Sequence, residues 1–193
     1  MHELIINSIS KHISLSKEDA RHIAASFKVK AFRKKEIVLQ LGEQCKYDYF
    51  VNKGCLRSFF HDQNDKEHTI TFAVGGWWTG NLKSFMTDSP SLFAVEAMID
   101  TEVLCITKQS LENLYQKVPL LNKFFRIILQ NNMIATQDRV ITHLSVPAET
   151  RYTVFVKKFP GLEQIVDQKI IASYLGITPA YLSRLRRKRL KNN

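Results

Sequence analysis

The sequence lacks the features of several large classes of protein. None of its apolar runs approaches the length that spans a membrane, and residues 1–22 do not have the basic-then-apolar layout of a secretory signal. No Gly-rich phosphate loop follows a predicted strand, which argues against nucleotide hydrolases and dinucleotide-binding enzymes. We therefore expect a cytoplasmic protein without a membrane-spanning segment.

Residues that carry catalysis or bind metals are also scarce. Cys45, Cys55 and Cys105 are widely spaced, form no CxxC pair and join no Cys/His cluster with zinc-like spacing. We expect reduced thiols on or between strands, with a redox sensor as the alternative. The histidines show no paired metal or haem spacing, and no nucleophile–base pair or carboxylate pair stands out. The sequence thus predicts neither an enzyme nor a metal site.

Positive charge, in contrast, is abundant and lies mostly at one end. The 193 residues have a formal net charge of +10. Residues 151–193 hold ten Lys or Arg against two acidic residues, so this segment accounts for +8 of that charge. Concentrated positive charge indicates a polyanionic partner, either nucleic acid or an acidic membrane face. The asymmetry also predicts two domains with different roles.

The first part of the chain changes from a helical to a strand-like pattern. Residues 1–30 are predicted to be helical, with Ser16 and Asp19 as an acidic variant of the capping box. From residue 31, short β-branched or aromatic runs alternate with turn residues, which favours an antiparallel barrel or jelly roll. The predicted turns include hairpin connections at Lys53-Gly54 and residues 61–65, and a sharp turn at Gly75-Gly76.

A long helix is predicted to follow. It opens at Pro119 and runs for about 27 residues, roughly 40 Å at 1.5 Å per residue. Its apolar residues are too many for one narrow stripe: Leu121, Phe124, Phe125, Ile128, Met133, Ala135, Val140 and Ile141. We expect one face to pack on its own domain and the other on the same helix of a second copy, in a homodimer. The alternative is a helix wholly buried within one domain.

Residues 168–187 fit a helix-turn-helix. Ala172 is the small residue needed where two steeply crossing helices approach, and Gly176 permits the positive φ of the turn. Thr178 is predicted to cap the second helix, with Pro179 at its first position. The apolar residues that hold the pair together are Ile171, Leu175, Ile177, Leu182 and Leu185. A DNA-binding domain is therefore predicted, and the alternative for the basic run is a solvated tail.

The outward face of the second helix carries the predicted DNA contacts. Arg184 is expected to read a base, because a guanidinium forms a bidentate fork to guanine in the major groove. The basic residues among 186–191 are expected to meet phosphates, as are the hydroxyls of Thr178 and Tyr181. The predicted set is Thr178, Pro179, Ala180, Tyr181, Ser183, Arg184, Arg186, Arg187 and Lys188.

A β-roll of about 115 residues, a long helix and a terminal helix-turn-helix resemble one known family. This is the layout of the cyclic-AMP receptor protein/fumarate–nitrate regulator (Crp/Fnr) family of bacterial transcription factors. The resemblance is most specific at "QKIIASYLGITPAYLSRLRRKRL" and is supported by "GEQCKYDYFVNKGCLR". It implies an α+β fold, effector binding in the roll and a signal transmitted through the long helix. The implied partners are a second copy of the chain, a palindromic operator in double-stranded DNA, and RNA polymerase.

The implied domains are a cyclic-nucleotide-binding-like roll (residues 1–118), a dimerisation helix (119–146) and a DNA-binding domain (147–193). The resemblance places a ligand pocket in the roll and on the long helix, at Gly80, Asn81, Leu82, Ser91, Leu92 and Thr136. Gly80, Leu82 and Thr136 match the family's pattern for cyclic-nucleotide binders.

The other three pocket residues depart from that pattern. Asn81 replaces a Glu, and Ser91-Leu92 stand where binders have Arg-Ser or Arg-Thr, whose Arg pairs with the cyclic phosphate. Loss of that Arg removes the bidentate contact that would neutralise a buried phosphate. We therefore expect no cyclic-AMP regulation and an effector that is unknown or absent. No other cofactor is predicted, because no N-terminal cysteine cluster offers an iron–sulfur centre.

One other function stays open beside a DNA-binding regulator. It is a small-molecule or cyclic-nucleotide sensor whose basic C-terminal end contacts a protein or a membrane. Such an end would need bulky apolar residues on the inner face of a basic helix. The segment after Thr178 offers Leu182, Leu185 and Leu190, which the helix-turn-helix already requires for packing. DNA is therefore the favoured partner, and no membrane partner is predicted.

Overall fold

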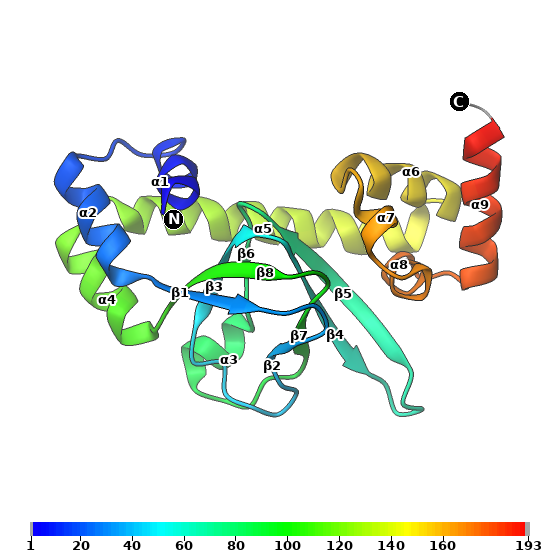
Figure 1. The fold of residues 1–193 in the computed structure, drawn as a ribbon, viewed down its shortest axis with the longest axis horizontal. Coiled ribbons are helices and arrows are strands. Elements are labelled where there is room, and N and C mark those ends of the chain that lie inside the picture. The colour runs from blue at the N-terminus through cyan, green and yellow to red at the C-terminus, as the bar shows by residue number, and fades with distance from the viewer. Residues whose placement is uncertain (1, 192–193) are drawn as a thin grey trace.

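The computed structural model describes residues 2–191, which form a β-roll, a long helix behind it and a small helical domain at one end (Figure 1). Two short helices precede the roll, α1 (Glu3–Ser10) and α2 (Lys17–Ser26). The capping box is confirmed at the start of α2. The backbone N–H of Asp19 donates to Ser16 Oγ over 3.0 Å, and the backbone N–H of Ser16 donates to the Asp19 carboxylate over 2.8 Å.

The described residues contain two four-stranded antiparallel sheets, so the predicted roll and α+β fold are confirmed. The strand orders are β1-β8-β3-β6 and β2-β7-β4-β5. The strands are β1 (Lys28–Phe32), β2 (Ile37–Leu39), β3 (Asp48–Lys53), β4 (Cys55–His61), β5 (Glu67–Val74), β6 (Trp78–Thr79), β7 (Ala94–Ala97) and β8 (Thr101–Ile106). The predicted helical character of residues 28–30 is wrong. They pair with β8, and this long-range pairing decides their conformation.

Two of the three predicted turns are confirmed, and one is corrected. Residues 61–65 join the paired strands β4 and β5 as a hairpin, and Gly75-Gly76 form a turn, with Gly76 at φ +87°. Lys53-Gly54 is not a hairpin connection, because β3 and β4 lie in different sheets. The chain crosses between the sheets at Gly54, where φ is +104°. A hairpin and a sheet crossing both need a residue with positive φ, so the local sequence does not distinguish them.

Gly54 is also enclosed, which leads to a stability prediction. A Cβ at this position would lie 2.7 Å from the Cα of Thr101. We expect Gly54→Ala to lower the free energy of unfolding by about 2–4 kcal/mol, from backbone strain and overpacking together. Gly76→Ala is the matched control: its φ is also positive, but the added Cβ would meet nothing within 4 Å. Denaturant titration of both variants checks this, and equal losses would show that the Thr101 contact is unimportant.

The interior of the roll is apolar and contacts the long helix through aromatic rings. Phe50, Leu56 and Leu104 are fully buried there, and α4 (Lys108–Lys117) packs against α2 at one end. The ring of Trp78 lies 5.3 Å from Phe50 and 5.1 Å from Phe125 between centroids. Such edge-to-face contacts stabilise beyond the area they bury. They fix the first turns of the long helix against the roll.

The long helix, α5 (Leu121–Ser145), has two distinct faces. Leu121 and Phe124 are buried against the roll, while a second apolar face is open to solvent. The exposed apolar residues are Leu129, Met133, Ile134, Val140, Ile141 and Leu144. Leu129, Met133, Val140 and Leu144 fall within about 60° of one another at 3.6 residues per turn, and we call these four the α5 stripe. The predicted second face is confirmed, and the alternative of a wholly buried helix is wrong.

The helical domain shares a core with the roll. It consists of α6 (Ala148–Lys158), α7 (Leu162–Ile165), α8 (Gln168–Leu175) and α9 (Pro179–Lys191). Phe72 on β5 packs against Phe159 and Tyr174, at 5.7 and 5.2 Å between ring centroids. Cys55 and Met98 of the roll belong to the same buried cluster. The helical domain therefore packs on β5. The sequence does not indicate this contact, because the two segments are far apart in the chain.

Candidate nucleic-acid interface

The α8–α9 pair has the features predicted for a helix-turn-helix. Ala172 is buried where the helices meet, and Gly176 adopts a left-handed conformation with φ +65°. The Thr178 hydroxyl accepts a hydrogen bond from the backbone N–H of Tyr181 over 3.2 Å, which is an N-cap. Leu182 is fully buried beneath the turn. These contacts fix the direction in which α9 leaves the domain.

The side chains predicted to meet DNA lie around the outer side of α9. Arg184 is exposed, and its Cζ lies 5.1 Å from the ring centroid of Tyr181. This cation–π contact restricts the directions that the guanidinium can take. The exposed members of the predicted set are Thr178, Pro179, Ala180, Arg184, Arg187 and Lys188, and the half-buried members are Tyr181, Ser183 and Arg186.

Three basic side chains of α9 are already paired with carboxylates inside the domain. Arg189 donates to Glu163 over 2.7 Å, and Arg186 Nε lies 3.5 Å from the other Glu163 oxygen. Lys188 Nζ donates to Glu149 over 2.8 Å. The sequence does not indicate these pairs, because Glu149 and Glu163 lie more than twenty residues before the basic side chains that they contact, and only the fold brings them close.

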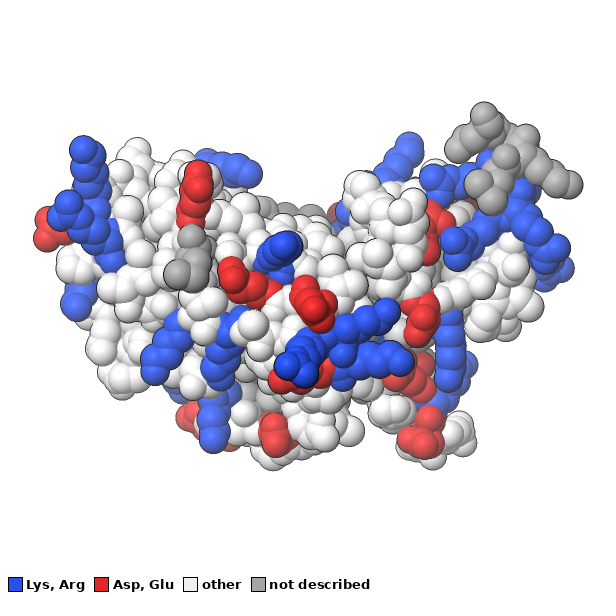
Figure 2. Space-filling model, viewed as in Figure 1, with Lys and Arg blue, Asp and Glu red and all other residues white. Residues whose placement is uncertain are grey.

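Among the side chains of α9 that the structure describes, Arg184 and Arg187 are therefore the cations without a carboxylate partner. Among the residues that the structure describes, no carboxylate lies within 4.0 Å of either guanidinium. Figure 2 shows Lys and Arg clustered at the end of the molecule that carries α9. An exposed, uncompensated guanidinium on a helix that a turn holds outward can form bidentate contacts with a phosphate or a guanine edge.

The helix-turn-helix is tied to the roll and the long helix by hydrogen bonds. Ser173 Oγ on α8 accepts from the backbone N–H of Thr69 over 2.9 Å and donates to the carbonyl of Glu67 over 3.1 Å. Arg151 donates to the carbonyl oxygens of Val146 and Leu175, at 2.7 and 3.0 Å. A shift of β5 or of the end of α5 would therefore act directly on α8.

The residues of the predicted ligand pocket are partly brought together. Asn81 caps α3 (Leu82–Thr87) by accepting from the backbone N–H of Ser84, and its Nδ2 donates to Ser91 Oγ over 2.9 Å. Ser91 in turn donates to the carbonyl of Phe93. The polar atoms of this stretch thus bond to one another. Gly80 precedes this cap with φ +146°.

The other predicted pocket residues face solvent. Leu82 and Leu92 are exposed on α3 and on the loop after it. Thr136 is exposed on α5, where its hydroxyl donates to the carbonyl of Asn132 in the preceding turn. The structure thus places Asn81 and Ser91 in one buried network, and it places Leu82, Leu92 and Thr136 on the surface.

The three cysteines are free and buried, as predicted for reduced thiols. Burial raises the pKa of all three, and the pKa of Cys55 reaches about 12. A redox-sensing cysteine needs an accessible thiolate at neutral pH, so these positions do not fit the redox alternative.

The described part of the chain has neither a candidate metal cluster nor a candidate membrane-spanning helix. Between residues 2 and 191, no three His, Cys, Asp or Glu side chains form a group that could hold a metal ion. No helix in the same range has the length and apolar character needed to cross a membrane.

The chain is similar to known regulators in sequence and in fold. The family described as "Cyclic nucleotide-binding domain" matches residues 29–118. The regulatory protein HlyX of Actinobacillus pleuropneumoniae is 22% identical over 168 residues, which is 81% of this chain and 69% of HlyX. FixK2 from Bradyrhizobium japonicum has a TM-score of 0.74 at 19% identity, over 86% of this chain and 85% of FixK2.

A CooA mutant from Carboxydothermus hydrogenoformans has a TM-score of 0.68 at 18% identity, over 95% of this chain and 83% of CooA. HlyX, FixK2 and CooA are regulators of the Crp/Fnr family and not enzymes. Residues 29–118 therefore match the cyclic nucleotide-binding domain family, and the chain as a whole resembles the Crp/Fnr regulators in its sequence and its fold.

Proposed function

We propose that the protein is a homodimeric transcription regulator that binds DNA sequence-specifically through α9. The presentation of Arg184 and Arg187 carries this proposal: a capped, tightly packed helix-turn-helix turns both guanidinium groups outward without an acidic partner among the described residues. Arg184 reads a base, and Arg187 and Lys188 meet phosphates, with Thr178 and Tyr181 as further phosphate contacts. A regulator of this kind acts in the cytoplasm and contacts RNA polymerase.

The α5 stripe supports the homodimer. Large apolar side chains are exposed along it, with Leu144 at 84% and Met133 at 64% of their surface. A continuous apolar face on a long helix is covered when the same helix of a second copy packs against it. Two copies related by a twofold axis would place two α9 helices on half-sites about one helical turn of DNA apart, in a palindrome. The proposed units are the roll (1–118), the dimerisation helix (119–146) and the DNA-binding domain (147–193).

The buried network around Asn81 supports a roll that does not respond to cyclic AMP. The resemblance puts Ser91 where cyclic-nucleotide binders have their phosphate-binding Arg. The Ser91 hydroxyl accepts a hydrogen bond from Asn81 and donates one to the carbonyl of Phe93. A cyclic phosphate entering here would have to break these bonds without gaining a bidentate cation. The effector of the roll, if the protein has one, is thus of a different chemistry.

The sensor alternative with a membrane-binding basic end has less support. Leu182 and Leu185 are buried within the helical domain, so they do not offer an apolar face to a bilayer. The outward side of α9 carries short, polar and cationic side chains. That composition suits a DNA groove.

Selection of bound sequences from a random DNA pool, with and without cyclic AMP, tests the proposed function. We expect one palindromic motif, the same in both arms, and binding that weakens steeply as salt rises. Absence of any sequence preference over random duplex at physiological salt would refute the regulator, and a motif or affinity that changes with cyclic AMP would refute the unresponsive roll.

Arg184→Ala separates base reading from phosphate contact. We expect it to cost about 1–3 kcal/mol of discrimination at one position of each half-site. Arg187→Ala is the matched variant one turn away, and it should instead weaken binding to all DNA sequences alike. It should also reduce the slope of log affinity against log salt concentration by about one. Competition binding against single-base variants of the selected site measures both effects. Uniform weakening by Arg184→Ala would place that side chain on a phosphate.

A further inference from the structure

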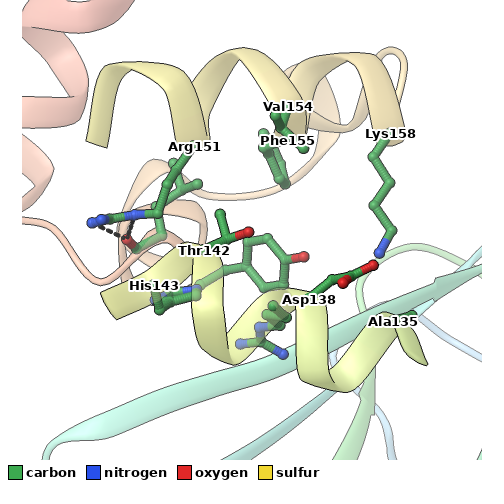
Figure 3. Close-up of a pocket in the computed structure, with 11 residues that line it drawn as sticks. Ala135, Asp138, Thr142, His143, Arg151, Val154, Phe155 and Lys158 are labelled. Carbon is green, nitrogen blue, oxygen red and sulfur yellow. Dashed lines mark hydrogen bonds between the residues drawn. The ribbon is translucent and has the colours of Figure 1, made fainter. Parts of the chain in front are cut away.

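A cavity of about 200 Å³ opens where the long helix meets the helical domain, and none of the proposed DNA contacts lines it (Figure 3). α5 forms one wall, α6 forms the facing wall, and the end of α8 contributes Tyr174 and Leu175. Val154 and Phe155 give the α6 wall an apolar surface. The cavity therefore lies at the joint that sets the position of α8 and α9 relative to α5.

We call this space between α5, α6 and α8 the hinge cavity, and its lining has an excess of positive charge. Arg139, His143, Arg151 and Lys158 line it, together with one carboxylate, that of Asp138. Within the described residues, no carboxylate lies within 4.0 Å of any of the four basic side chains. Figure 3 shows the Lys158 side chain extending from α6 toward Asp138 on α5. Arg139, His143 and Arg151 are half-buried, and Lys158 is exposed. Neighbouring cations without a close counter-ion favour the binding of an anion.

The basic side chains differ in the hydrogen bonds that they already make. Arg151 donates from Nε, Nη1 and Nη2 to backbone carbonyls, so it holds the joint together. Arg139 makes one long bond, of 3.3 Å, to the carbonyl of Thr69, and its guanidinium lies 4.6 Å from the Tyr174 ring centroid. Lys158 Nζ lies 5.2 Å from the ring centroid of Trp77. Arg139 and Lys158 therefore have donors to offer a ligand.

The electrostatics of the cavity agree with this geometry. Burial, and then the charge of Arg139, lower the pKa of Lys158. Burial, and then the charges of Arg139 and Arg151, lower the pKa of His143. The positive charges thus destabilise one another, and an anion placed among them would relieve that repulsion.

We propose that the hinge cavity binds the phosphate group of a small phosphorylated hydroxy compound, held by Arg139 and Lys158. An arginine fork and a lysine ammonium suit a phosphate monoester, which carries up to two negative charges. The cavity is smaller than the roughly 300–1,000 Å³ of drug-sized ligand sites, so the ligand is small. Asp138 and Thr142 offer acceptors for ligand hydroxyl groups.

Occupancy of the hinge cavity would join α5 to α6 and α8. A ligand that contacts both Arg139 and Lys158 would favour one orientation of the helical domain on the long helix. The consequence for DNA rests on the proposed function, whereas binding of the phosphate compound does not.

Calorimetry on the full chain, without DNA and at constant ionic strength, tests the site. The probes are inorganic phosphate, glycerol phosphate and glycerol. We expect saturable binding of glycerol phosphate and none of glycerol. Binding of inorganic phosphate as tight as that of the ester would make free phosphate the ligand of the same site. Failure of both phosphate compounds to bind saturably would overturn the proposal, whatever the outcome of the DNA selection.

Three variants locate the binding. Lys158→Gln should weaken it about tenfold or more, because it removes a charged donor. Ala135→Phe keeps every charge but fills the cavity from the α5 side, and it should abolish binding. Lys157→Gln removes the neighbouring charge on α6, which does not line the cavity, and should leave binding unchanged. Two outcomes would overturn the site: Lys158→Gln that binds as tightly as the wild type, or Lys157→Gln that loses as much affinity as Lys158→Gln. Either would show general attraction of the anion to a basic protein.

Discussion

Val140→Glu is expected to convert the protein from a dimer to a monomer without unfolding it. Val140 lies in the middle of the α5 stripe and is more than half exposed in the isolated chain, so a Glu side chain at this position can extend into solvent within one copy. Across a twofold interface, however, each copy would bury an unpaired carboxylate that faces its twin. We expect the dissociation constant of the dimer to rise about a thousandfold or more, which corresponds to about 4 kcal/mol.

Sedimentation across a concentration series measures this change. Asn131→Glu is the matched control, because it places the same carboxylate on an exposed position of α5 outside the stripe. It should sediment like the wild type. Unchanged circular dichroism of Val140→Glu would show that the monomer stays folded. A wild-type chain that is monomeric at tens of micromolar, or a Val140→Glu chain that stays dimeric, would rule out the stripe as the dimer interface.

Monomerisation should also weaken DNA binding. A dimer binds two half-sites of DNA. Once the first half-site is bound, the second α9 helix is held close to the second half-site, which raises the overall affinity. A monomer loses this gain in affinity. The Val140→Glu monomer still carries an intact α9. It should therefore bind a single half-site much as one arm of the wild type does, and the gain from a palindrome should disappear.

The helix-turn-helix was predictable from the sequence because its requirements are local. The turn and the cap are specified within four residues, by Gly176, Thr178 and Pro179. Because these residues are near neighbours in the chain, they stay close together whatever the tertiary fold. The capping box at Ser16 was predictable for the same reason. Where residues close in the chain hydrogen-bond to each other's backbone groups, the sequence alone is enough to predict the local structure.

Features that depend on residues far apart in the chain were not predictable. Lys53-Gly54 has hairpin composition, yet the strands on its two sides pair with different partners. Glu163 forms ion pairs with Arg186 and Arg189 across the domain. Fewer basic side chains of α9 are therefore uncompensated than the sequence of the basic run suggests. The hinge cavity likewise combines α5, α6 and α8. Each of these features follows from tertiary packing, which local patterns do not encode.

Arg57→Met should lower the free energy of unfolding by about 3–5 kcal/mol at neutral pH. Arg57 is 5% exposed and lies on β4 between two carboxylates. Its Nη1 and Nη2 donate to Glu67 at 2.5 and 3.0 Å, and its Nε donates to Glu96 at 2.7 Å. Removing the cation leaves two negative charges partly buried and unpaired, which is the costly way to break a buried ion pair.

The loss should depend on pH with a defined sign. Burial by itself raises the pKa of Glu67, but the hydrogen bonds and the charge of Arg57 outweigh burial, so this pKa lies below its ordinary value of 4.5. A lowered folded-state pKa stabilises the protein above the unfolded-state pKa, and that stabilisation disappears as the pH falls through the folded-state value. The difference between wild type and Arg57→Met should therefore shrink below about pH 4, where protonated carboxyls no longer need the cation.

Denaturant titrations at neutral and acidic pH test both the magnitude and the sign. Lys66→Met, an exposed basic residue in the hairpin next to Glu67, is the control and should change stability by less than about 0.5 kcal/mol. Replacing Glu67 and Glu96 by Gln in the Arg57→Met background should recover part of the loss, because no unpaired charge is then buried. A loss that persists unchanged at acidic pH would show that Arg57 acts through packing on Phe59, 4.2 Å from its guanidinium, and not through the carboxylates.

The same variant should reach the DNA-binding domain. The carbonyl of Glu67 accepts the hydrogen bond from Ser173 on α8, so the ion cluster holds the segment of β5 on which the helix-turn-helix rests. Hydrogen exchange of α8 in Arg57→Met should therefore speed up more than that of α4, which packs on α2 at the other end of the roll. Equal acceleration in both helices would mean global destabilisation alone, whereas a selective effect on α8 would identify the Arg57 cluster as a link between the roll and the DNA-binding helices.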